Sequence, residues 1–110
     1  CKIKAMRLMI FIFSFLTIVS CNFSQNENKD SIIVDVRTTE EWQQDGHADC
    51  AVNYPLDQFE SKIDELKAYK NVTLVCRSGN RAEQAKLMLE SNGYQHAENK
   101  GAWQNIMCEK

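Results

Sequence analysis

The feature that most constrains this 110-residue chain is the stretch from Val72 to Arg81 and the segment that follows it. Residues 72–75 form a short apolar run rich in β-branched side chains, which predicts a buried strand. The next six residues, Cys-Arg-Ser-Gly-Asn-Arg, cannot continue it. Residues 82–91 then have helix-forming composition, with small and apolar side chains at helical spacing and a glycine at position 93 suited to end the helix. The sequence therefore predicts a buried strand, a polar loop and a helix in direct succession.

Cys76 is the residue in this stretch that carries chemistry. It ends the strand where the loop enters a helix N-terminus, and there backbone N–H groups and the helix dipole favour an anion. Arg77 and Arg81 add two positive charges, and all three effects favour thiolate, the nucleophilic form of cysteine. The alternative is an inert buried cysteine, but the polar loop after it would then be costly to bury. We interpret Cys76 as a catalytic cysteine in an anion-binding loop.

The spacing of the loop narrows the chemistry. Cysteine-dependent phosphatases place an arginine six positions after the nucleophile, whereas Arg81 lies five positions after Cys76. A shorter loop encloses a smaller space, which is better suited to a sulfur bound on the cysteine than to a phosphate. The loop Cys76–Arg81 resembles the active-site loop of rhodanese-type sulfurtransferases, in which the cysteine carries sulfane sulfur as a persulfide.

The first 20 residues predict a secretory signal peptide, because three basic residues precede an apolar run too short to span a bilayer. An uncleaved anchor is the alternative. Ile18-Val19-Ser20-Cys21 is similar to a bacterial lipobox, which implies lipidation of Cys21; conventional cleavage is the alternative there. Residues 21–31 would then form a polar tether to a domain over residues 32–110. These features predict an exported bacterial lipoprotein, anchored to a membrane in the cell envelope and facing the periplasm.

Charge and cysteine content exclude several classes of protein. The chain has 13 basic and 15 acidic residues, and removing the three basic residues of the leader leaves 10 against 15, a net charge of −5. This acidic balance argues against nucleic-acid binding. Outside the leader the cysteines are Cys50, Cys76 and Cys108, with no C-x-x-C pair and no metal-ligand spacing to a histidine, so we expect neither a metal nor another cofactor. Whether Cys50 and Cys108 form a disulfide is left open.

Strand and helix signals alternate along the rest of the chain. Strands are predicted over residues 31–37, 51–54 and 72–76, and helices over 38–45, 57–66, 82–91 and 101–106, the second with capping-box spacing from Asp57 to Glu60. This alternation predicts an α/β domain with a small parallel sheet flanked by helices on both faces. Ligands bind such sheets at the carboxyl ends of the strands, where Arg37 and Cys76 both fall.

Further segments extend the resemblance over about residues 32–107. Asp35-Val36-Arg37 with Glu40-Glu41-Trp42, Gly46-His47 with residues 51–56, and Gly93-Tyr94 with residues 98–103 are similar to successive rhodanese motifs. The chain most resembles the small single-domain periplasmic members of the phage-shock-protein-E type. Cys50 and Lys100 depart from the pattern, because each stands where the family usually has glycine. Cys50 as a second redox-active thiol is another open alternative.

The resemblance implies a thiosulfate sulfurtransferase. Cys76 would take the outer sulfur of thiosulfate and pass it to cyanide, a small thiol or a protein thiol. Arg77, Ser78, Gly79, Asn80 and Arg81 would bind the substrate and the persulfide, with Ser78 and Asn80 mainly bracing the loop. Asp35, Arg37 and His47 would be structural, and Trp103 either a pocket wall or core. A persulfide carrier or redox sensor with little turnover is the alternative, and a phosphatase or arsenate reductase a weaker one.

Overall fold

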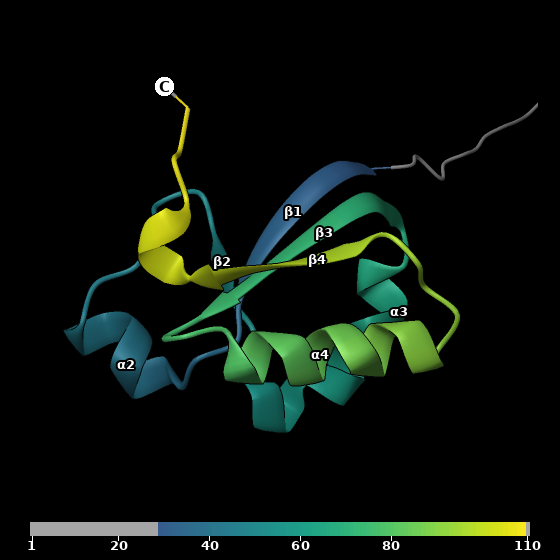
Figure 1. The fold of residues 1–110 in the computed structure, drawn as a ribbon, viewed down its shortest axis with the longest axis horizontal. Coiled ribbons are helices and arrows are strands. Elements are labelled where there is room, and N and C mark those ends of the chain that lie inside the picture. Colours follow the sequence, from purple (N-terminus) through teal and green to yellow (C-terminus); the bar gives the residue numbers. More distant parts are fainter. Residues whose placement is uncertain (1–28, 110) are drawn as a thin grey trace, which may run out of the picture.

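Four parallel strands form one sheet in the computed structural model, which describes residues 29–109 (Figure 1). The strands are β1 (Lys29–Asp35), β2 (Val52–Asn53), β3 (Tyr69–Cys76) and β4 (Ala97–Ala102), in the order β2-β1-β3-β4. β1 and β3 lie at the centre, with Val34 opposite Leu74. The α/β architecture with a parallel sheet is therefore confirmed.

The core lies between one face of the sheet and the helices that follow β2 and β3. The 3-10 helix η2 (Leu56–Lys62) runs directly into α3 (Ile63–Leu66), and α4 (Asn80–Ser91) follows the β3 loop; Figure 1 shows α3 and α4 on the same side of the sheet. The buried side chains of this layer match the predicted apolar positions: Phe59, Ile63, Leu66, Ala82, Ala85 and Leu89. They pack against strand residues such as Val34, Val72 and Leu74, and this burial holds α4 against β3 and β4.

The other face of the sheet is covered by the end of the chain. The turn η3 (Trp103–Asn105) lies on this side (Figure 1), and the segment up to Met107 borders a hollow over Ile33 and Thr73. A disulfide joins Cys50 to Cys108 and ties the end of the chain to the loop before β2. The disulfide that the sequence left open is therefore present, and neither of its cysteines is a free thiol in this structure.

Four predicted boundaries are corrected by the structure. β1 begins at Lys29, so the last three residues assigned to the tether belong to a strand. No side chain caps η2, which starts at Leu56, so the predicted Asp57 capping box is wrong. Strand β4 spans Ala97–Ala102, so its last two residues belong to the segment predicted as the last helix, and only the single turn η3 of that helix forms.

The predicted signal peptide, Cys21 and most of the tether lie outside the described residues. Within residues 29–109, no helix is long and apolar enough to cross a membrane. The same range contains no group of three or more His, Cys, Asp or Glu side chains arranged to bind a metal ion.

Candidate active site

Cys76 is the last residue of β3 and is only 1% exposed. Its sulfur accepts a hydrogen bond from the backbone N–H of Gly79 at 2.9 Å. Helix α4 begins at the next residue, Asn80, with Gly79 as its N-cap in the left-handed conformation at φ +106°. The loop therefore curls back over the sulfur and points its N–H groups, together with the positive end of the α4 dipole, at Cys76.

Burial and hydrogen bonding act on the Cys76 thiol in opposite directions. Burial raises its pKa, but the backbone N–H groups of Ala82, Gly79, Ser78 and Arg81 donate to the sulfur and together outweigh the burial, so the pKa is lowered. The thiolate is therefore stabilised by fixed backbone dipoles. This donor set differs from the predicted span of residues 77–81, because it extends into α4 and does not include Arg77 or Asn80.

Two glycines and an asparagine fix the shape of the loop. β4 has an irregularity beside Val75, where Leu74 pairs with Asn99 and Val75 with Gly101, so Lys100 is the extra residue. Asn99 then donates from Nδ2 to the carbonyl of Gly79 at 3.0 Å and to Glu83 at 2.9 Å. A Cβ on Gly79 would lie 3.3 Å from the Cα of Gly101, so the two glycines allow the loop and β4 to approach closely.

The two loop arginines are paired with carboxylates of α2 (Thr39–Gln44) and its C-cap. Arg81 donates to both oxygens of Glu41, at 2.8 and 3.0 Å. Arg77 is exposed and reaches Glu41 at 3.8 Å and Asp45 at 3.4 Å. Hydrogen bonds from Arg81, followed by that from the Thr38 backbone, lower the pKa of Glu41 to about 2. The positive charge that the sequence predicts around Cys76 is thus largely compensated.

Asp35 and Arg37 form a buried ion pair at the carboxyl end of β1. Arg37 donates from Nε and Nη2 to the Asp35 carboxylate at 2.8–3.1 Å, and from Nη2 to the carbonyl of Gly46 at 2.8 Å. The ring of Trp103 lies over its guanidinium, 4.8 Å away. Both charges are therefore satisfied inside the domain, which is what a buried pair requires. These contacts link β1, the end of α2 and η3, and Trp103 packs here.

The remaining predicted residues take supporting positions. The His47 ring stacks on Trp42 with centroids 3.6 Å apart, and its Nδ1 lies 2.8 Å from the Trp42 carbonyl. Within residues 29–109, neither the Ser78 nor the Asn80 side chain makes a hydrogen bond to protein, although both were predicted to brace the loop. Asn99 supplies that bracing instead.

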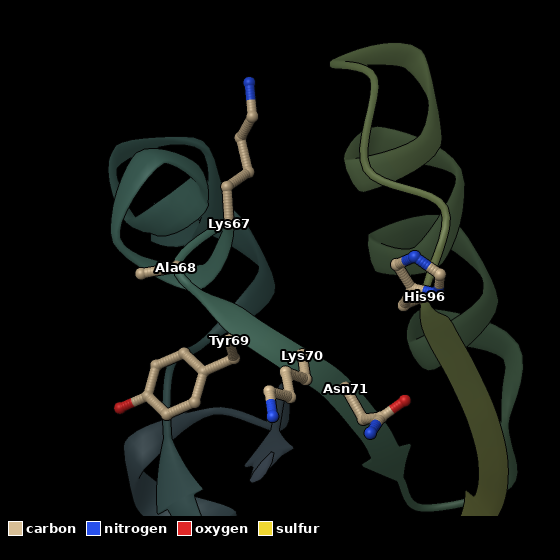
Figure 2. A pocket seen from close by; sticks show the side chains of 6 residues that line it. All are labelled: Lys67, Ala68, Tyr69, Lys70, Asn71 and His96. Carbon is tan, nitrogen blue, oxygen red and sulfur yellow. The ribbon is translucent and has the colours of Figure 1, made fainter. Parts of the chain in front are cut away.

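A cavity lies at the opposite end of the strands, where β3 begins. It has a volume of about 430 Å³ and is lined by residues from the end of α3, the start of β3 and the approach to β4, including Tyr69, Lys70 and His96 (Figure 2). It contains no cysteine. A smaller hollow of about 280 Å³ is lined by Arg81, Val36 and Leu56 and so adjoins the Cys76 loop. The Cys76 loop places the candidate site beside this smaller hollow, at the carboxyl end of β3.

The loop geometry agrees with the relationships of the whole chain. The model of the rhodanese-like domain family matches residues 22–107. The chain belongs to the rhodanese-like domain family. Cys76 and its loop lie between the end of β3 and the start of α4 of this rhodanese-like domain.

Relatives of this rhodanese-like domain include proteins named for different functions. It is 37% identical to the thiosulfate sulfurtransferase PspE of Escherichia coli over 79 residues, covering 70% of this chain and 75% of that protein. It is also 37% identical over 76 residues to the tRNA uridine(34) hydroxylase of Buchnera aphidicola, covering 64% of this chain and 24% of that protein. The chain thus spans about a quarter of the hydroxylase.

A solved structure described as a rhodanese with anions from Escherichia coli superimposes on the domain with a TM-score of 0.62. Its sequence is 34% identical, and the match covers 72% of this chain and 94% of that one. The small rhodanese fold therefore accounts for nearly all of that protein and for most of this one.

Sequence reasoning did not assign a role to two residues that shape this rhodanese site. Glu41 appears only as part of the E-E-W segment, and Asn99 only as a neighbour of Gly101. The capping box of Thr38 and Glu41 was a visible signal for α2, but the same Glu41 oxygens also bind Arg81 from 40 residues away. The contact is long-range, so local spacing could not reveal it.

Proposed function

We propose that this protein is a thiosulfate sulfurtransferase that works through a persulfide on Cys76. The observation that carries the proposal is the set of four backbone N–H groups directed at the Cys76 sulfur, which lowers the pKa of the thiol despite burial. The same donors suit the outer, anionic sulfur of a persulfide. The likeness to PspE supports thiosulfate as the donor.

The proposed reaction has two displacements. In the first, the Cys76 thiolate attacks the outer sulfur of thiosulfate, the sulfur–sulfur bond of thiosulfate breaks, and sulfite leaves with the bonding electron pair. In the second, cyanide or a thiolate attacks the outer persulfide sulfur, and Cys76 leaves as thiolate. Neither step needs a base at the active site when the attacking group reacts as its anion, and the lowered pKa of Cys76 favours the thiolate. The position of His47 against Trp42 suits a structural role.

The paired arginines bear on a second candidate function. Arg81 and Arg77 are tied to Glu41 and Asp45, so less positive charge is left to attract a dianionic donor. This charge compensation favours a carrier that receives sulfur from a partner and turns over thiosulfate slowly. The redox-sensor and phosphatase interpretations would use the same thiolate, and the short loop disfavours the phosphatase.

The test is to incubate the purified protein with thiosulfate and follow its intact mass, then add cyanide and measure thiocyanate. A one-sulfur mass gain that disappears with cyanide over many cycles is expected. The Cys76→Ser variant should gain no sulfur. A mass gain with little turnover would favour the carrier, and no mass gain would refute both sulfur-transfer functions and leave a redox sensor or phosphatase to be tested.

We further propose that the protein is exported and held at a membrane through Cys21. The sequence of residues 1–21 supports this proposal, and the Cys50–Cys108 disulfide is consistent with an oxidising compartment.

A further inference from the structure

Two adjoining hollows form one groove that starts beside the Cys76 loop. The inner hollow, of about 280 Å³, is lined by Val36, Leu56 and Arg81, and the outer one, of about 250 Å³, by Glu40 and Gln58 among others. Both are lined by Thr38, Pro55 and Asp57, so they lie next to each other on the surface. We call this surface the Pro55 groove.

Arg81 connects the Pro55 groove to the nucleophile. Its backbone N–H donates to the Cys76 sulfur, while the residue also lines the inner hollow. Its pKa is raised first by the bond to Glu41 and then, against the effect of burial, by the negative charges of Glu41 and of the Cys76 thiolate. Its guanidinium bonds both oxygens of Glu41. A molecule in the inner hollow would thus contact a residue of the Cys76 loop.

The walls of the groove change character along its length. The inner part has apolar walls from Val36, Pro55 and Leu56, which suit aliphatic carbon atoms. Asp57 lines both parts and Glu40 lines only the outer part, and both carboxylates are exposed. A ligand that runs along the groove would thus meet apolar surface and one carboxylate in the inner part and two carboxylates in the outer part.

The negative charge of the outer groove is not compensated by neighbouring cations. Glu41 and Asp45 are paired with Arg81 and Arg77, so they and the two arginines largely cancel. In the described part of the chain, Asp57 and Glu40 make no ion pair, and Arg81 is the only basic residue that lines the groove. Uncompensated charge of one sign at the mouth of a site raises the local concentration of ligands of the opposite sign.

We infer that the Pro55 groove receives the sulfur acceptor, and that this acceptor is a thiol with a positive charge a few atoms from its sulfur. The inference rests on the persulfide chemistry proposed above. The thiol sulfur attacks the outer persulfide sulfur, the bond from that sulfur to the Cys76 Sγ breaks, and Cys76 leaves as thiolate. The acceptor keeps its proton on the new persulfide, so atoms and charge balance without a separate oxidant or reductant.

The test compares three small thiols that differ mainly in charge: cysteamine, 2-mercaptoethanol and 3-mercaptopropionate. The full-length protein is loaded with thiosulfate, and kcat/KM is measured for each acceptor and for cyanide. The Glu40→Gln/Asp57→Asn double variant is compared with Asp64→Asn, which removes an exposed carboxylate outside the groove. Each rate is divided by the cyanide rate of the same variant. The ratio of kcat/KM between two acceptors is then compared between variant and wild type, so differences in thiol pKa cancel.

The ratio of kcat/KM for cysteamine to that for 3-mercaptopropionate is expected to fall about tenfold in the double variant. It should stay within about twofold in Asp64→Asn, and 2-mercaptoethanol should respond little in either variant. In wild type the preference should shrink as salt is raised, because exposed charges are screened.

An unchanged ratio in the double variant, or an equal fall for all three thiols, would overturn the inference. Loading and cyanide discharge would remain intact in that case, so the proposed function would stand. If thiosulfate leaves no sulfur on Cys76, the proposed function fails first and the inference fails with it. The mass measurement tells the two failures apart.

Discussion

At the scale of single residues, the main stabilisation of the Cys76 thiolate comes from backbone N–H groups that the fold holds in place. Burial works against ionisation, and four N–H donors overcome it. The arginines contribute less than their number suggests, because Glu41 holds Arg81 through two hydrogen bonds. Fixed dipoles need no reorganisation when charge appears on sulfur, which would be an advantage in a site that alternates between thiolate and persulfide as proposed above.

The first prediction concerns the ionisation of Cys76. Its alkylation rate should rise with pH around a midpoint below the ordinary thiol value, because the folded loop lowers the pKa. Iodoacetamide labelling followed by mass spectrometry measures this midpoint, and the urea-unfolded chain gives the reference. The lowered pKa also means that this thiol stabilises the fold above its unfolded pKa and loses that effect as pH falls through the folded value. A folded midpoint at or above the unfolded one would contradict the prediction.

The second prediction concerns Glu41, whose carboxylate joins the cap of α2 to Arg81. Glu41→Gln should lower the free energy of unfolding at pH 7 by about 1–2 kcal/mol, because it weakens two charge-assisted hydrogen bonds in a part-exposed site. Urea unfolding measures the change. Since the pKa of Glu41 is lowered to about 2, its contribution is present above pH 4.5 and is lost as pH falls toward 2.

A matched control for Glu41 is Glu40→Gln, which changes the neighbouring exposed carboxylate of the same helix turn. Glu40 bonds neither Arg77 nor Arg81, so its substitution should have a smaller effect on stability. Equal losses in the two variants would show that the helix N-terminus, rather than the Arg81 contact, is what Glu41 stabilises.

At the scale of elements, most strands and helices could be predicted because local signals agreed with burial. The apolar run of β3, the Thr38 capping box and the spacing of Phe59, Ile63 and Leu66 each indicate the element that forms. β4 could not, because its sequence Ala-Glu-Asn-Lys-Gly-Ala lacks apolar alternation and is a strand only through pairing with β3. The Asp57 capping box failed because Pro55 places the start of η2 one residue earlier.

In the candidate site, too, local contacts could be predicted from the sequence and long-range contacts could not. The geometry of the Cys76 loop could be predicted from one contiguous stretch, where thiol, glycine and helix start follow each other. The role of Cys76 as nucleophile stays a prediction. The contacts of Glu41 and Asn99 could not be predicted, because they join segments 40 and 20 residues apart. Asn99 reaches the loop only because Lys100 is an extra residue in β4, a feature of strand register that composition does not reveal.

The third prediction concerns the Cys50–Cys108 disulfide, which links the loop before β2 to the segment after η3. Replacing both Cys50 and Cys108 by serine should lower the free energy of unfolding by about 3–4 kcal/mol, because the disulfide closes a chain segment with a sequence separation of 58. Denaturant unfolding measures it. Reductant should lower the free energy of unfolding of wild type and leave that of the double variant unchanged. In the absence of reductant, Cys76 should still be loaded with sulfur in both proteins. Equal stability of wild type and variant would show that the link adds nothing to the fold.

At the scale of the whole molecule, parallel pairing separates two ends of the sheet. Cys76 and the Pro55 groove lie at the carboxyl ends of the strands, whereas Lys29, where the described chain begins, starts β1 at the opposite end (Figure 1). An attachment that precedes Lys29 would therefore hold the domain by the end away from its nucleophile. This arrangement leaves the groove accessible to an acceptor of the kind inferred above.

The fourth prediction tests this arrangement in a cell. The full chain expressed in a Gram-negative bacterium should be recovered with membranes, with the Cys50–Cys108 disulfide formed, because disulfides persist in the periplasm and not in the cytosol. Cys21→Ser should release the protein from the membrane fraction, since the acylation proposed at Cys21 would then have no site. Fractionation measures recovery with the membranes, and thiol labelling before and after reduction measures formation of the disulfide. Cys108→Ser serves as the control that removes the disulfide and keeps the anchor.

Recovery of wild type in the cytosol with three free thiols in the domain would refute export. Membrane recovery of Cys21→Ser would show that the apolar segment itself is the anchor.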